Sequence, residues 1–208
     1  MHRHDRARGF TLVELLIALA IVGALLAVAF GGLRVAVTSL ARGEDRAEVH
    51  QHERGVAQIL GRAIGAAYPY RASPGPAPDP KVLFKGTETR LEFVTQAPPI
   101  PFTIPVAFAA VVVALETEDT GDRALIVRER ILPNQNPFTE ASVVLRDPSV
   151  HSLTFRYLNE GGGWVDTWDA ETENGLPRAI KISLAAVRGG RAETLGPLIV
   201  SLRSLEAR

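Results

Sequence analysis

The chain has 208 residues, with 23 Lys and Arg against 23 Asp and Glu and therefore a formal net charge of zero. This balance excludes the basic footprint of a nucleic-acid-binding protein, and a charged fraction of 22% in a mixed sequence argues against disorder. The chain contains no cysteine, which excludes disulfides, thiolate catalysis and Cys-ligated zinc or iron–sulfur sites. At this length one ordinary domain can bury a sufficient core, and chain remains for an additional segment.

An apolar run near the N-terminus is long enough to cross a membrane. Residues 10–33 contain Glu14 as their only charged residue. At about 1.5 Å per helical residue they exceed the roughly 30 Å of a bilayer core. Arg3, Arg6 and Arg8 precede the run, and by the positive-inside rule they hold residues 1–9 in the cytoplasm. We therefore expect a single membrane span at residues 10–33.

The helix is expected to continue beyond the span. Every proline lies at or after Pro69, so one helix from residue 10 to about residue 67 is possible. Residues 34–67 are amphipathic, with an apolar stripe that includes Val56, Leu60 and Ile64. We expect part of this stripe to cover the following domain and the remainder to form a partner interface with a neighbouring helix. The proline-rich residues 68–81 are predicted to be an exposed linker.

The hydrophobic period changes to two after the linker, which predicts β-strands. The candidate strands are residues 82–85, 90–95, 106–116, 124–131, 142–145, 152–158, 178–187 and 198–205. Glycines at 161–163 and 189–190 supply the positive-φ positions that tight hairpins require. The expected fold is α+β, with a long N-terminal helix packed on an antiparallel sheet domain at residues 82–208.

The junction between the charged and apolar N-terminal segments carries a specific motif. Residues 8–16 read RGFTLVELL, which resembles the processing site of type IV prepilins and type II secretion pseudopilins. The resemblance implies that a prepilin peptidase removes residues 1–9 by cutting after Gly9 and that the new terminus, Phe10, is N-methylated. It also implies a pilin-like fold.

Glu14 is independently notable because an ionisable group inside a span costs about 2.5–3.5 kcal/mol even on insertion scales. Its carboxylate lies four residues from Phe10, a helical rise of roughly 6 Å. An amino terminus freed at Phe10, in the same or a neighbouring subunit, can therefore neutralise it and set the axial register of assembly. The alternative is that Glu14 reaches the headgroups without a partner. An ordinary signal peptide, cut after Ala27-Val28-Ala29, is disfavoured because the apolar run is too long.

The C-terminal half carries a second resemblance. The segment LTFRY at 153–157, then Trp164 and Trp168, then LPRAIKISL at 176–184 are together similar to the J-type minor pseudopilins of type II secretion systems. This implies a non-catalytic subunit of a pseudopilus tip complex with I-type and K-type minor pseudopilins and the major pseudopilin, which primes filament assembly for protein export. The chain would be a single-pass inner-membrane protein with its C-terminal domain in the periplasm. Minor pilins of type IV pili are similar enough to remain an alternative.

Candidate chemistry elsewhere has simpler explanations. His50 and His52 point to different helical faces, which favours solvated surface over a metal site. The acidic residues between Asp166 and Glu173 lack calcium-loop spacing. We expect the two tryptophans to anchor a loop, although a membrane-anchored ligand-binding β domain stays open as a second hypothesis. The sequence contains none of the common nucleophile-elbow, phosphate-loop, dinucleotide or zinc-helix motifs, and we expect no enzymatic activity, metal or cofactor.

Overall fold

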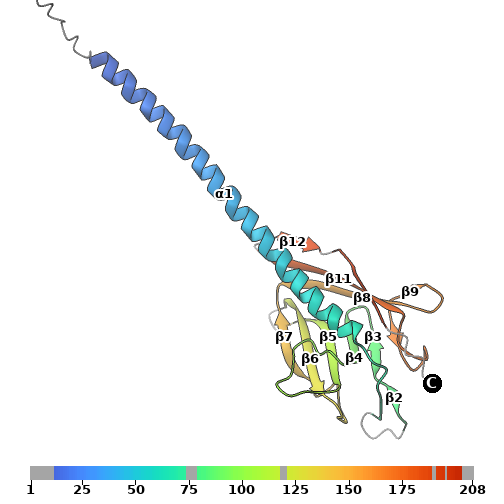
Figure 1. Ribbon diagram of the computed structural model, residues 1–208. Coiled ribbons are helices and arrows are strands. Elements are labelled where there is room, and N and C mark those ends of the chain that lie inside the picture. Colours follow the sequence, from blue (N-terminus) through green and yellow to red (C-terminus); the bar gives the residue numbers. More distant parts are fainter. Residues whose placement is uncertain (1–11, 74–78, 118–120, 189–190, 195, 203–208) are drawn as a thin grey trace, which may run out of the picture. The chain divides into compact units, whose positions relative to one another are not determined.

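The computed structural model describes residues 12–73, 79–117, 121–188, 191–194 and 196–202 (Figure 1). The chain divides into two compact units, Met1–Ala47 and Glu48–Arg208. Helix α1 (Leu12–Gly65) contributes to both units.

The described part of the first unit is helical throughout. Leu12–Arg34 is the one helical segment, within the described ranges, that is long and apolar enough to cross a membrane, and none of it is buried by the rest of the chain. Leu12 and Phe30 are 77% and 65% exposed. The helix passes without interruption through the adjacent glycines Gly31 and Gly32. Apolar side chains so exposed need lipid or neighbouring helices around them.

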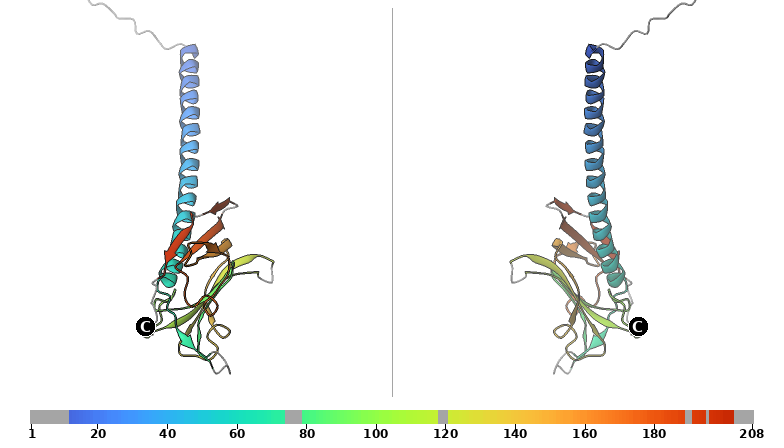
Figure 2. Two further views of the ribbon diagram at one scale, coloured as in Figure 1. Left: turned by 90° about the vertical axis from the view of Figure 1, so that its right-hand side faces the viewer. Right: turned by 90° about the vertical axis from the view of Figure 1, so that its left-hand side faces the viewer.

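The second unit contains the end of α1 and three antiparallel sheets (Figure 2). The six-stranded sheet has the order β10 (Trp168–Asp169), β3 (Phe84–Gly86), β4 (Arg90–Thr95), β5 (Ala109–Thr117), β6 (Arg123–Ile131), β7 (Ser142–Asp147). The five-stranded sheet has the order β12 (Arg191–Thr194), β11 (Ala179–Arg188), β8 (Val150–Leu158), β9 (Trp164–Val165), with β13 (Leu198–Ser201) also paired to β11. A small sheet pairs β1 (Arg71–Ala72) with β2 (Lys81–Val82).

One hydrophobic core joins the last turns of α1 to the inner faces of both larger sheets. The helix supplies Leu60 and Ile64, which are fully buried. The six-stranded sheet supplies Phe93 and the five-stranded sheet supplies Phe155, both fully buried as well. The same helical stripe therefore holds the two sheets in one domain.

The central strand β5 departs from the alternation expected of an antiparallel strand. Its residues from Ala109 to Ala114 are all buried, because both faces of the sheet are covered at this position. Val111 and Val113 face the main core, whereas Ala110 belongs to a smaller cluster with Val94 and Leu132. A strand covered on both faces reads as a continuous apolar run, as this sequence does.

The predicted α+β, pilin-like fold class is confirmed, and the expected strands correspond to β2/β3, β4 to β8, β11 and β13. The hairpin predicted at the first glycine run joins β8 to β9, with Gly162 at φ 82°. Residues 68–81, predicted to be an exposed linker, behave differently where they are described. Tyr68 and Tyr70 pack on Phe108, with ring centroids 4.9 and 5.2 Å apart, so the stretch is fastened to the domain.

Alanine substitutions at two glycines are expected to change the free energy of unfolding in opposite directions. A Cβ at Gly86 would collide with the buried Tyr157 ring, whose hydroxyl donates to the Thr87 carbonyl at 2.8 Å. We expect Gly86→Ala to lower the free energy of unfolding by about 1–3 kcal/mol. A Cβ at helical Gly55 meets nothing within 4 Å, so Gly55→Ala should raise it by about 1 kcal/mol through helix propensity. Thermal unfolding of the chain in detergent micelles measures both, and shifts of the same sign would contradict the prediction.

Candidate functional site

The predicted processing residues Gly9 and Phe10 lie outside the described residues. Glu14 is in the first turn of α1, within the segment able to span a membrane. Its acidic side chain near a helix N-terminus is favourably placed relative to the helix dipole. Cleavage, methylation and the assembly role of Glu14 stay predictions from the sequence.

The partner interface predicted at Val56, Leu60 and Ile64 requires a correction. These side chains are only 5%, 0% and 0% exposed and belong to the main core. The amphipathic pattern correctly indicated a stripe that is buried, but it is buried by the chain's own sheets. These three side chains are therefore not available to a neighbouring subunit.

Among the described side chains of α1 in the second unit, the exposed ones are polar. Gln51, Arg54, Gln58 and Arg62 are all exposed and recur at steps of three and four, so they share one face of the helix. Arg62 also donates from Nη2 to the Pro99 carbonyl at 3.3 Å. The face available to another protein is therefore basic and hydrophilic.

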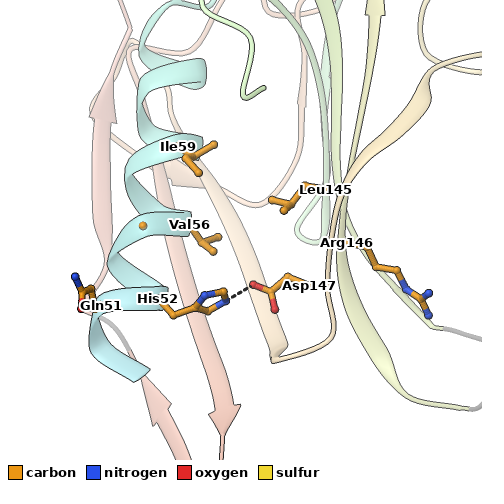
Figure 3. A pocket seen from close by; sticks show the side chains of 8 residues that line it. Gln51, His52, Val56, Ile59, Leu145, Arg146 and Asp147 are labelled. Carbon is orange, nitrogen blue, oxygen red and sulfur yellow. Dashed lines mark hydrogen bonds and ion pairs between the residues drawn. The ribbon is translucent and has the colours of Figure 1, made fainter. Parts of the chain in front are cut away.

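A groove of about 610 Å³ lies beside this face, between α1 and strand β7 (Figure 3). It is lined by Gln51, His52, Gly55, Val56, Ile59, Leu145, Arg146 and Asp147. Its residues come from two segments more than eighty positions apart, and only the fold brings them together.

His52 and Asp147 join the helix to β7 at this groove. His52 Nε2 lies 2.7 Å from Asp147 Oδ2 and donates to it, while Ser149 donates to Oδ1 through its hydroxyl at 2.6 Å and its backbone N–H at 3.0 Å. The Asp147 side chain is 7% exposed and that of His52 is 42% exposed. Burial alone would raise the pKa of Asp147, but the hydrogen bonds from Ser149 and His52 hold this pKa below its usual value. The sequence predicted only solvated surface at His52 and gave no signal for its pairing with Asp147.

The pKa of a second buried carboxyl, Glu129, is shifted in the opposite direction to that of Asp147. Its Oε1 accepts the Ile100 backbone N–H at 2.9 Å, whereas Oε2 is buried without a hydrogen-bond partner among the described residues. Burial raises the pKa of Glu129. The carboxyl fastens the loop that follows β4 to strand β6, which is a structural role that the sequence did not indicate.

Trp168 is the loop anchor that the sequence predicted, whereas Trp164, in strand β9, is only partly buried. Trp168 is 4% exposed and its indole N–H donates to the Gly175 carbonyl at 2.9 Å. The Lys181 ammonium lies 4.5 Å from the Trp164 ring centroid and covers it. The buried Trp168 ring therefore offers no open stacking platform.

The neighbouring acidic residues take part in ion pairs with basic side chains of the sheets: Asp166 with Arg156, Asp169 with Lys85, and Glu171 with Lys81. In the described part of the chain, no group of three or more candidate ligands is arranged to hold a metal ion.

An apolar N-terminal helix followed by antiparallel sheets that enclose its end is the architecture of a pilin-like, single-pass anchored subunit. Comparison with known families agrees, because the prokaryotic N-terminal methylation motif matches residues 4–30 and type II secretion system protein J matches residues 31–196. The chain belongs to the type II secretion system protein J family.

A relative named type II secretion system protein J, from Xanthomonas campestris pv. campestris, is 28% identical over 211 residues that cover 95% of this chain and 93% of that protein. Both resemblances read from the sequence are thereby confirmed. Membership makes the chain a minor pseudopilin of type II secretion, a structural subunit associated with other pseudopilus components. It decides between the secretion system and the pilus, which the sequence had left open.

The hydrogen bonds of Asp147 predict how stability depends on pH. Because its pKa is lower in the folded than in the unfolded state, its contribution is present above the usual carboxyl pKa and is lost as the pH falls. Asp147→Asn should lower the free energy of unfolding by about 2 kcal/mol at neutral pH and by less in acid. Denaturant unfolding across pH, with exposed Asp122→Asn as the control, measures this. An equal loss at every pH would contradict the prediction.

Proposed function

We propose that the chain is a non-catalytic subunit of the pseudopilus tip complex, where it joins I-type and K-type minor pseudopilins, contacts the major pseudopilin and primes filament assembly for protein export. The observation that carries the proposal is the pair of family matches, which meet at residues 30 and 31 and together take in the apolar segment and nearly all of the sheet domain. A subunit with these two parts is suited to assembly from the membrane.

The proposal divides the chain by compartment. Residues 1–9 form a cytoplasmic leader that a prepilin peptidase removes, residues 10–33 cross the inner membrane, and residues 34–67 continue the helix. The sheet domain then lies in the periplasm. The arginines before the span support this orientation, since positive residues are retained on the cytoplasmic side. The absence of cysteine is compatible with an oxidising compartment.

Glu14 has the assembly role in this proposal. A carboxylate in a span is costly unless it finds a partner, and a new amino terminus at Phe10 of a neighbouring subunit supplies an ammonium group at the same depth. Pairing between subunits then neutralises both charges and fixes how far one helix is shifted along the other. In the pseudopilin family, the subunit at the extreme tip lacks the equivalent glutamate, so its presence here suits a subunit with another above it.

The first prediction from this function concerns the mature terminus. We expect the chain recovered from membranes of a host with an active prepilin peptidase to begin with N-methylated Phe10, because the cut falls between the charged leader and the apolar span. Intact-mass spectrometry of the detergent-extracted chain gives the answer, with Gly9→Leu as the uncleaved control. A Met1 terminus, or one near Phe30 as a signal peptidase would leave, would contradict the proposal.

The second prediction concerns the buried charge. Glu14→Leu should leave membrane insertion and processing intact, because it removes a cost of about 2.5–3.5 kcal/mol, yet it should reduce assembly with neighbouring subunits. Secretion and cross-linking to the major pseudopilin measure assembly at wild-type expression level. Leu15→Ile is the matched control, since it changes an adjacent apolar residue without altering charge. Normal secretion by the Glu14→Leu chain would refute the assigned role.

A further inference from the structure

One ridge of α1 in the second unit is left uncovered by the sheets. Gln51, Arg54, Gln58 and Arg62 form it, and Gly55 lies beside them on the same side of the helix. The ridge is polar over about three turns, which distinguishes it from the apolar segment that precedes it in the chain.

The chain's own strands hold α1 on both flanks of this ridge. On one flank, the position of a Cβ at Gly61 lies 3.0 Å from Leu198 of β13, and that at Gly65 lies 3.5 Å from Val200. On the other flank, His52 bonds to Asp147 of β7. The helix is thus fixed in rotation, and the ridge is a permanent feature of the domain surface.

The groove beside the ridge has the shape to receive side chains from a second helix. Gly55, Val56 and Ile59 are among the helical residues that line it, and Figure 3 shows Val56 and Ile59 directed toward Leu145 of β7. Ile59 and Leu145 are half-buried and give the groove an apolar floor. A Cβ at Gly55 would meet no atom within 4 Å, so a bulky side chain can approach the backbone there.

The charges around the groove favour an acidic partner. Arg54 and Arg62 are eight residues apart, which places them about 12 Å apart along the helix. The groove's one carboxylate, Asp147, is buried and engaged by His52 and Ser149. Glu53 is the only acidic residue between positions 51 and 65, and the structure does not describe its side chain.

We propose that the ridge of Gln51, Arg54, Gln58 and Arg62, together with the groove at Gly55, docks an acidic helix of a neighbouring pseudopilus subunit. The partner helix places carboxylates two turns apart against the two arginines and an apolar side chain over Gly55. This rests on the proposed function, because it assigns the surface by which that assembly holds this domain. A partner helix can place two carboxylates two turns apart with a bulky residue between them, which matches the two arginines and the groove. The phosphates of a lipid surface form a flat layer and have no side chain to fill the groove.

The cysteine-free chain allows a direct test. Full-length chain carrying Gln58→Cys is labelled with a thiol-reactive benzophenone, reconstituted in detergent with each of the other minor pseudopilins of the same secretion system, and irradiated. We expect cross-links to the helix of one of these subunits, at a segment containing Asp or Glu, identified by mass spectrometry. Gln135→Cys, an exposed glutamine on the loop after β6, is the matched control and should give no such product.

Affinity measurements test the charge and the groove separately. Arg54→Glu should weaken binding to that subunit about tenfold, and raising salt from about 0.05 M to about 0.5 M should weaken the wild-type complex. Arg123→Glu, on an exposed residue at the start of β6, should change affinity less than twofold. Gly55→Trp should abolish docking while Gly55→Ala preserves it, and circular dichroism checks that both variants are folded.

The outcomes separate this inference from the proposed function. If wild-type complexes form but Arg54→Glu and Gly55→Trp bind within twofold of wild type, or if the cross-links fall on a strand added to β7, the docking surface is wrong and the tip-complex assignment stands. If no complex forms with any minor pseudopilin, both are wrong.

Discussion

The second unit depends on one contact, the burial of a single stripe of α1 between two sheets. Leu60 and Ile64 are fully buried there, and each side chain contributes about 1.5–3 kcal/mol by leaving water. Phe93 and Phe155 reach the same core from opposite sheets. An antiparallel sheet needs a covered apolar face, and the helix completes the core that the two sheets share. The end of the membrane-anchoring helix is therefore also the centre of the domain's core.

Two buried carboxyls show how this arrangement responds to pH. Hydrogen bonds from Ser149 and His52 hold the pKa of Asp147 low, so its stabilisation is lost as the pH falls. Burial raises the pKa of Glu129, so the folded state binds its proton more tightly and this contribution is lost as the pH rises. The two effects have opposite signs and act at different places. Asp147 holds α1 to β7, and Glu129 holds the loop that begins after β4.

Hydrophobic periodicity in the sequence predicted most of the helices and strands. The predictions failed where a contact depends on a residue far away in the sequence, or where an element is too short to show a period. Strand β4 matches the expected residues 90–95 because its edges are marked by polar residues. The two-residue strands β9 and β10 were missed because two residues have no period. Amphipathicity identified Leu60 as a contact residue without showing whether its partner was the same chain or another. His52 and Asp147 are 95 positions apart, and no local rule joins them.

The burial of the apolar stripe of α1 by the chain's own sheets has a consequence for assembly. Because the chain's own sheets occupy the apolar stripe of α1, the described face that the helix leaves exposed in the second unit is polar and carries Arg54 and Arg62 beside the groove. The exposed apolar residues of Leu12–Arg34 instead need lipid or neighbouring helices around them, and the role proposed for Glu14 adds charge neutralisation to that packing. The docking proposal and the Glu14 proposal therefore assign different forces to the two segments of one helix. Salt screens charges on the exposed polar face but has little effect on contacts enclosed by lipid. The salt dependence of assembly therefore separates the contribution of the polar face from that of the membrane segment.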